Sequence, residues 1–125
     1  MGRLDSGYGA ASGKAGSRMR AWDIYSFQPS EWPESHPAVI VSHPERVTNK
    51  PEVTILMCSS KAPTRPAKPH EVILDTSDGL EWPTLCKCDL LYTVPKAQLK
   101  NHRGSVTQER RQQIMATINR SNGWV

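Results

Sequence analysis

The chain has no long apolar run. Residues with apolar or aromatic side chains make up 37% of its 125 residues. No stretch approaches the roughly 20 apolar residues that a membrane-spanning helix requires. The N-terminus also lacks the apolar segment of a secretory signal peptide. These absences predict a soluble, cytoplasmic protein without a membrane partner, and the length fits one domain with a modest core.

Cysteine is scarce and odd in number, with three residues in the chain. A complete set of disulfides is therefore not implied. Cys86 and Cys88 are two apart in a strand-like segment, so their side chains should share a face. Two interpretations stay open, namely buried or half-buried free thiols and a zinc site completed by His70 or His102. We expect free thiols, with no metal and no other cofactor.

Long helices are disfavoured by ten prolines spread through the chain, which are typical of short strands joined by turns. Five segments rich in apolar, aromatic or β-branched residues are predicted as strands: residues 21–27, 37–42, 53–59, 70–74 and 84–94. The second contains an uninterrupted apolar run at residues 39–41, which predicts burial on both faces of the sheet.

One helix is predicted near the C-terminus, over residues 108–120. Thr107 is a suitable N-cap, and Glu109 lies in the first turn, where the helix dipole favours a carboxylate. Gly123 can end the helix. The expected inward-facing stripe consists of Ile114, Met115 and Ile118. Together these elements predict a mainly β fold, a small and strongly curved antiparallel barrel-like sheet with a C-terminal α-helix packed on it.

Positive charge is unevenly distributed along the chain. Residues 1–18 are rich in Gly, Ser and Ala and are predicted to be a disordered leader, with the folded domain at 19–125. Of the net charge of +4, +3 falls within residues 1–20. Nucleic-acid binding by the folded part would therefore need a local basic cluster. The most basic loop of the folded part carries Lys61, Arg65 and Lys68.

A cation and a carboxylate flank Cys88. Lys87 and Asp89 are two apart in a predicted strand, so we expect both side chains to project from one face. Such a pair suits acid–base chemistry on a phosphodiester. From these residues alone, a surface salt pair is the alternative.

Five short motifs occur in an order and spacing that resemble one protein family. They are RAWDIY at 20–25, Glu31 followed by HPAVIVS at 36–42, a strand ending in serine at 53–60, CDLLYTVPK at 88–96, and GSVTQE at 104–109. Across about residues 20–121 the chain resembles the MazF/PemK (Kid) toxins of bacterial toxin–antitoxin modules. Members of that family share an SH3-like barrel with the gyrase poison CcdB.

The resemblance implies a toxin that cleaves single-stranded RNA, such as mRNA, without a metal. The 2′-hydroxyl attacks the adjacent phosphate and leaves a 2′,3′-cyclic phosphate and a 5′-hydroxyl. The resemblance also implies a homodimer and an acidic, partly disordered antitoxin that folds onto it. The alternative is a binding protein on the same fold, either gyrase-directed like CcdB or retaining only its dimer and partner contacts.

Site residues follow from the resemblance by position. Asp89 is expected to be the general base, and Lys87 stands in place of an arginine as acid or charge stabiliser. His36 replaces the family's arginine before proline, and a histidine can donate a proton near neutral pH. The expected catalytic residues are His36, Ser60, Lys87 and Asp89, and the expected RNA-binding residues are Glu31, Ser59, Lys61 and Arg65.

The departures from the family pattern bear on the choice between the two functions. Leu90 and Tyr92 stand where the family has glutamine and arginine. Together with His36 they favour the binding protein, whereas Lys87 and Asp89 favour RNA cleavage.

Overall fold

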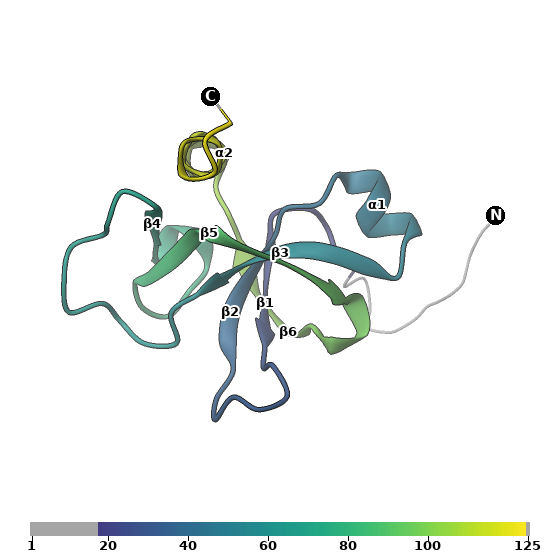
Figure 1. The fold of residues 1–125 in the computed structure, drawn as a ribbon. Helices are drawn as coiled ribbons and strands as arrows, with labels where there is room; N and C mark the ends of the chain where they lie inside the picture. Colours follow the sequence, from purple (N-terminus) through teal and green to yellow (C-terminus); the bar gives the residue numbers. More distant parts are fainter. Residues whose placement is uncertain (1–17, 125) are drawn as a thin grey trace.

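The computed structural model describes residues 18–124. Most of the predicted leader, residues 1–17, lies outside the described residues. Figure 1 shows a mainly β fold with a helix at the C-terminus. The elements are β1 (Asp23–Phe27), β2 (His36–Ile40), α1 (Pro44–Asn49), β3 (Glu52–Cys58), β4 (Glu71–Leu74), the 3-10 turn η1 (Thr76–Asp78), β5 (Thr84–Pro95), the 3-10 turn η2 (Lys96–Gln98), β6 (Lys100–Ser105) and α2 (Gln108–Ser121).

All six strands form one antiparallel sheet in the order β4-β5-β3-β2-β1-β6. The sheet is curled, and this brings the turn after β4 into contact with β6 at the opposite edge. A Cβ atom on Gly104 would lie only 2.1 Å from the carbonyl oxygen of Asp78, so only glycine permits this close approach. The prediction of a small, curved antiparallel β fold with a C-terminal helix is confirmed.

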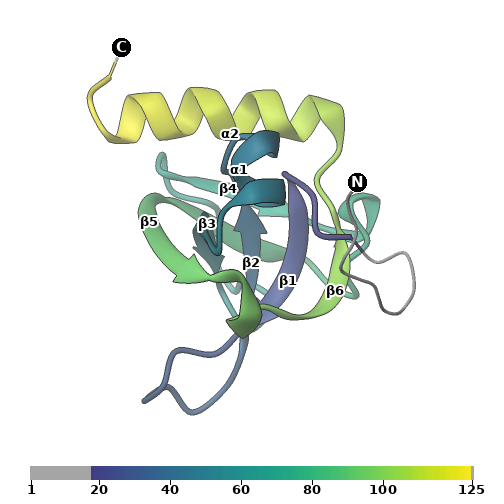
Figure 2. The same ribbon diagram turned by 90° about the vertical axis from the view of Figure 1, so that its right-hand side faces the viewer.

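Apolar side chains cover both faces of the central strands. Along β2, Val39 packs into one cluster, and Ala38 and Ile40 pack into the other. The first cluster receives Ile114 from α2, and the second receives Val47 from α1. Figure 2 shows α2 lying across one end of the strands. The predicted burial on both faces of β2 is therefore confirmed, because strands with alternate residues in two clusters need an unbroken apolar run.

The start of α2 is confirmed at the predicted position. Thr107 is the N-cap, and its side chain accepts a hydrogen bond from the backbone N–H of Arg110 at 3.3 Å. The buried carboxylate of Asp78 accepts from the backbone N–H of Thr107 at 3.0 Å. This bond links the helix start to the turn after β4.

The sequence predictions were wrong in three respects. Five strands were predicted, but Lys100–Ser105 pairs with β1 as a sixth strand. One helix was predicted, but Pro44–Asn49 forms a second, short helix. Met115 was expected to face inward, whereas 46% of its surface is exposed. Only Ile114 and Thr117 of α2 are buried, because the helix rests on the sheet along a narrow strip.

Within the described part of the chain, no helix has the length and apolar character needed to cross a membrane.

Candidate active site

Six of the eight predicted site residues line one pocket of about 480 Å³. They are His36, Ser59, Ser60, Lys61, Arg65 and Lys87. The pocket lies where β2 begins, where β3 ends, and along the first half of β5. Two loops complete its wall, residues 28–35 between β1 and β2 and residues 59–70 between β3 and β4. The fold therefore brings together side chains that are up to 51 positions apart in the sequence.

His36 is held in one orientation at the start of β2. Its ring Nδ1 lies 2.9 Å from the carbonyl oxygen of Cys58. A carbonyl oxygen only accepts hydrogen bonds, so Nδ1 carries the hydrogen. In the neutral ring, Nε2 then has a free lone pair, and in the charged ring it carries a proton. Trp32 packs edge-on against the ring, with 4.8 Å between the ring centroids. His36 can therefore exchange a proton through Nε2.

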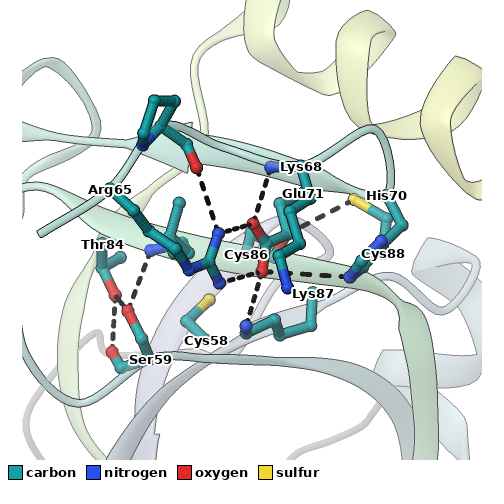
Figure 3. Close-up of polar contacts among 12 residues, drawn as sticks. Cys58, Ser59, Arg65, Lys68, His70, Glu71, Thr84, Cys86, Lys87 and Cys88 are labelled. Atoms are coloured by element: carbon teal, nitrogen blue, oxygen red, sulfur yellow. Dashed lines mark hydrogen bonds and ion pairs between the residues drawn. The ribbon is translucent and has the colours of Figure 1, made fainter. Parts of the chain in front are cut away.

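The hydroxyl of Ser59 is fully used inside the protein. It accepts from the backbone N–H of Leu85 at 3.0 Å, lies 2.8 Å from the Thr84 hydroxyl and donates to the carbonyl of Lys61 at 3.1 Å. The Thr84 hydroxyl donates to the Ser59 carbonyl at 2.5 Å (Figure 3). A hydroxyl has one hydrogen, and that of Ser59 is donated within the protein, so Ser59 has none left to donate to a phosphate oxygen. It fixes the end of β3 to β5.

The neighbouring Ser60 joins the two pocket loops. Its hydroxyl donates to the carboxylate of Glu34 at 2.7 Å. Glu34 lines the pocket, whereas the predicted Glu31 is exposed and lies outside the pocket lining. Glu34, rather than Glu31, is therefore the carboxylate that this loop contributes to the pocket.

A buried carboxylate lies behind the pocket's cations. The side chain of Glu71 has no exposed surface. It accepts two hydrogen bonds from Arg65, at 2.8 and 2.9 Å, and one from Lys87 at 2.5 Å. The backbone N–H of Lys68 donates to it at 2.8 Å. Figure 3 shows these groups converging on the carboxylate.

These contacts shift the ionisation of the cluster. The hydrogen bonds from Arg65 are the main reason that the pKa of the Glu71 carboxyl lies well below its usual range. Burial acts in the opposite direction, whereas the hydrogen bonds from Lys87 and from the Lys68 backbone lower the pKa further. The same hydrogen bonds raise the pKa of Arg65. Two cations share one carboxylate, so the cluster keeps a surplus positive charge. Arg65 and Lys87, together with Lys61, form a local basic cluster in the folded part of the chain, which nucleic-acid binding there would need.

Acid should weaken the fold through Glu71. Its folded-state pKa lies below the ordinary value of 4.5. The carboxylate therefore stabilises the fold above about pH 4.5, and this contribution is lost as the pH falls further. We expect the free energy of unfolding of wild type to exceed that of Glu71→Gln at pH 6, and the difference to shrink progressively below pH 4.5. Urea titrations at several pH values measure this difference. A difference in the free energy of unfolding that stays constant down to pH 3 would contradict a lowered pKa for Glu71.

Asp89 is exposed and is not among the residues that line the pocket. The pairing of β5 with β3 is irregular here, because Leu56 and Cys58 of β3 lie opposite Leu91 and Cys86 of β5. A step of two residues along β3 therefore corresponds to a step of five along β5, which makes the pairing bulged. Side chains of β5 in this stretch do not simply alternate between the two faces of the sheet. Lys87 and Leu90 reach the pocket lining, but Asp89, which lies between them in the sequence, does not.

The three cysteines are buried free thiols. Hydrogen bonding among neighbouring thiols, together with burial, raises the pKa of Cys86 and Cys88. His70 lies 3.9 Å from Glu71, and His102 lies 3.5 Å from Asp23. Among residues 18–124, no group of three or more His, Cys, Asp or Glu residues is arranged to hold a metal ion. The zinc alternative therefore has no ligand set in the described chain.

Glu71, Glu34 and Trp32 were not among the site residues predicted from the sequence. Glu71 had a usable signal, because it is a carboxylate within an apolar strand that follows the most basic loop. A buried charge needs a partner, so a pairing with that loop could have been expected. Glu34 and Trp32 lie in a polar loop without periodicity, where no pattern marks a residue as part of a site.

Comparison with known proteins gives one family. Residues 21–121 match the family described as PemK-like, MazF-like toxin of type II toxin–antitoxin system. No curated protein sequence matches the chain.

Several solved structures share the fold. The Mycobacterium tuberculosis toxin MazF-mt6 is similar with a TM-score of 0.69 and 20% identity, covering 81% of this chain and 96% of its own. A mycobacterial endoribonuclease in complex with its cognate antitoxin has a TM-score of 0.67 and 20% identity, covering 86% and 95%. A MazE–MazF complex from Deinococcus radiodurans has a TM-score of 0.65 and 12% identity, covering 86% and 98%.

Proposed function

Because the chain belongs to the PemK-like, MazF-like toxins of type II toxin–antitoxin systems, we propose that it is a metal-independent endoribonuclease acting on single-stranded RNA. One observation carries this proposal. A single pocket combines a histidine with a free ring nitrogen, His36, and two cations, Arg65 and Lys87. These groups can supply the acid and the cationic site that cleavage by the RNA's own 2′-hydroxyl requires in addition to a base.

The proposed reaction needs a base, an acid and a cationic site for the phosphate. The 2′-hydroxyl loses its proton to the base, and its oxygen bonds to phosphorus. The bond from phosphorus to the 5′-oxygen then breaks, and that oxygen takes a proton from the acid. Lys87 and Arg65 stabilise the charge on the phosphate oxygens. The products are a 2′,3′-cyclic phosphate and a 5′-hydroxyl.

We assign the base to Asp89 and the acid to His36. Asp89 is exposed next to Leu90 on β5 but outside the pocket lining, so the attacking ribose would have to extend past Leu90 to reach it. His36 lines the pocket itself, where the leaving oxygen would lie. Lys61 can contact the RNA backbone from the loop. The one hydrogen of the Ser60 hydroxyl goes to Glu34, so Ser60 can only accept a hydrogen bond from the RNA, and Ser59 holds the loop in place.

The second candidate is a binding protein without nuclease activity, gyrase-directed or otherwise. Leu90 and Tyr92 are 40% and 41% exposed on β5. Exposed apolar side chains beside a pocket also suit a protein partner.

The proposed partners follow from the family and from the titles of the similar structures. We propose a cognate antitoxin, since two of the similar structures are complexes of a toxin with its antitoxin or of MazF with MazE. An acidic segment would complement the basic cluster formed by Lys61, Arg65 and Lys87. We also propose a homodimer in the cytoplasm. Sedimentation at micromolar concentration should give the mass of two chains, and a monomer throughout would contradict the dimer.

The test is RNA cleavage by antitoxin-free protein in the presence of EDTA. We expect cleavage of a varied single-stranded RNA pool and its inhibition on addition of the antitoxin. A charge-removal variant at the pocket, Lys87→Met, serves as the inactive control. If the wild type leaves the whole pool intact under these conditions, the ribonuclease proposal fails and the binding protein replaces it.

A further inference from the structure

Glu71 has no role in the proposed chemistry, yet its carboxylate contacts two cations of the pocket. It is the cross-strand partner of Lys87 in the β4–β5 pairing. Its side chain is fully buried, whereas those of Arg65 and Lys87 keep 38% and 26% of their surface exposed. The carboxylate thus lies inside, and the two cations remain accessible at the pocket.

The contacts with Glu71 leave both cations with hydrogen-bond donors to spare. Arg65 has five N–H donors, of which two go to Glu71 and one to the carbonyl of Pro66. Lys87 has three, of which one goes to Glu71. Each cation therefore retains two donors for a ligand such as a phosphate.

Without a carboxylate between them, two adjacent cations on long side chains repel and move apart. Glu71 also accepts from the backbone N–H of Lys68, so it anchors the basic loop at two points, Arg65 and Lys68. Groups fixed before the substrate arrives need no rearrangement during the reaction. A displacement of about 1 Å in such a group can cost about 10²-fold in rate.

We propose that Glu71 is a positioning residue that holds Arg65 and Lys87 side by side as one phosphate-binding pair for RNA. This inference rests on the proposed function, because it assigns the pair to the RNA phosphate. Glu71 itself does not touch the substrate. It sets the spacing and orientation of the two cations that do.

The test compares Glu71→Gln with wild type in two assays. In the first, kcat for RNA cleavage should fall by about 10- to 10²-fold. In the second, binding of an uncleavable 2′-O-methylated RNA is measured at several salt concentrations. The dependence of log Kd on log salt concentration should become shallower by about 0.7, because one lost phosphate contact removes roughly that amount from the slope for a single strand.

A purely electrostatic role gives the opposite result in the binding assay. Glu71→Gln removes a negative charge beneath the pocket, so it should then tighten binding and steepen the salt dependence. Circular dichroism checks that the variant is folded. Glu71→Asp keeps the charge with a shorter reach, so it should recover part of kcat and part of the slope. If Glu71→Gln does not fold, Glu71→Asp decides, with a several-fold loss of kcat expected.

Glu81→Gln is the matched control, because it breaks another arginine–glutamate pair, with Arg103 at 3.0 Å, outside the pocket lining. It should change neither kcat nor the salt dependence. A folded Glu71→Gln or Glu71→Asp variant with wild-type kcat and an unchanged or steeper slope overturns the inference. If wild type binds RNA but does not cleave it, the proposed function fails. The role of Glu71 is then decided by whether Glu71→Gln makes the salt dependence of RNA binding shallower. Absence of RNA binding by wild type overturns both.

Discussion

His36→Asn is expected to lower the rate of RNA cleavage by about 10²- to 10⁴-fold, the usual contribution of a positioned acid or base. Asparagine can place its amide nitrogen where the ring Nδ1 of His36 donates to the Cys58 carbonyl. It therefore preserves the local hydrogen bond, and it removes the second ring nitrogen, which exchanges the proton, together with the ring contact to Trp32. The measurement is single-turnover cleavage of RNA in EDTA.

The pH profile of the His36 variant separates an acid from a structural group. A bell-shaped profile is expected for wild type, and loss of the acid should flatten its alkaline side. His43→Asn is the matched control, because His43 caps α1 through its Nδ1 and is exposed, and asparagine is itself a good N-cap. This control should retain wild-type activity. Wild-type cleavage by a folded His36→Asn variant would show that His36 takes no part in the chemistry.

Asp89→Asn is expected to lower the cleavage rate by about 10²-fold or more, as for the loss of a general base. Removing this exposed carboxylate also removes a negative charge two residues from Lys87, so RNA should bind as tightly as before or more tightly. The expected pattern is thus a large fall in kcat without a rise in KM. The acidic side of the pH profile should flatten at the same time.

Glu52→Gln controls for the loss of one surface carboxylate. Glu52 is exposed at the start of β3, whereas the pocket lies at the other end of that strand. The variant should cleave at the wild-type rate. If Asp89→Asn behaves like this control, Asp89 is an ordinary surface charge, and the base must be sought within the pocket, where His36 is the first candidate.

Most of the sheet was predictable because its inner strands are buried on both faces. The apolar run at residues 39–41 and the β-branched segment of β3 can satisfy two clusters only as strands. The helix α2 was predictable from its cap, Thr107, which is a local feature of the sequence.

The edge strand β6 and the helix α1 were not predictable by the same reasoning. The sequence of β6, Lys100–Ser105, has no apolar residue and no buried position, and it is held by pairing with β1. Helix α1 has six residues and buries only Val47, so no helical period can develop. Its cap is His43, which is not a typical N-cap residue.

The site was partly predictable through resemblance to a family. That route identified His36 and Lys87, the basic composition of the loop at 60–69 identified Arg65, and the fold brings all three into one pocket. The resemblance could not show that the hydroxyl of Ser59 is consumed by contacts with β5, because those contacts come from residues about 25 positions away. Nor could it reveal that Lys87 pairs with Glu71, since that pairing depends on the register of two strands.

The most direct test of the central claim uses an RNA with one 2′-deoxy nucleotide at a mapped cleavage site, incubated with antitoxin-free protein in EDTA. Mass spectrometry of the products identifies their ends. The account predicts 2′,3′-cyclic phosphate and 5′-hydroxyl ends from the all-ribose RNA, and no cleavage at the deoxy position while other sites are still cut. Cleavage at the deoxy position, or products with 5′-phosphate ends, would contradict attack by the 2′-hydroxyl.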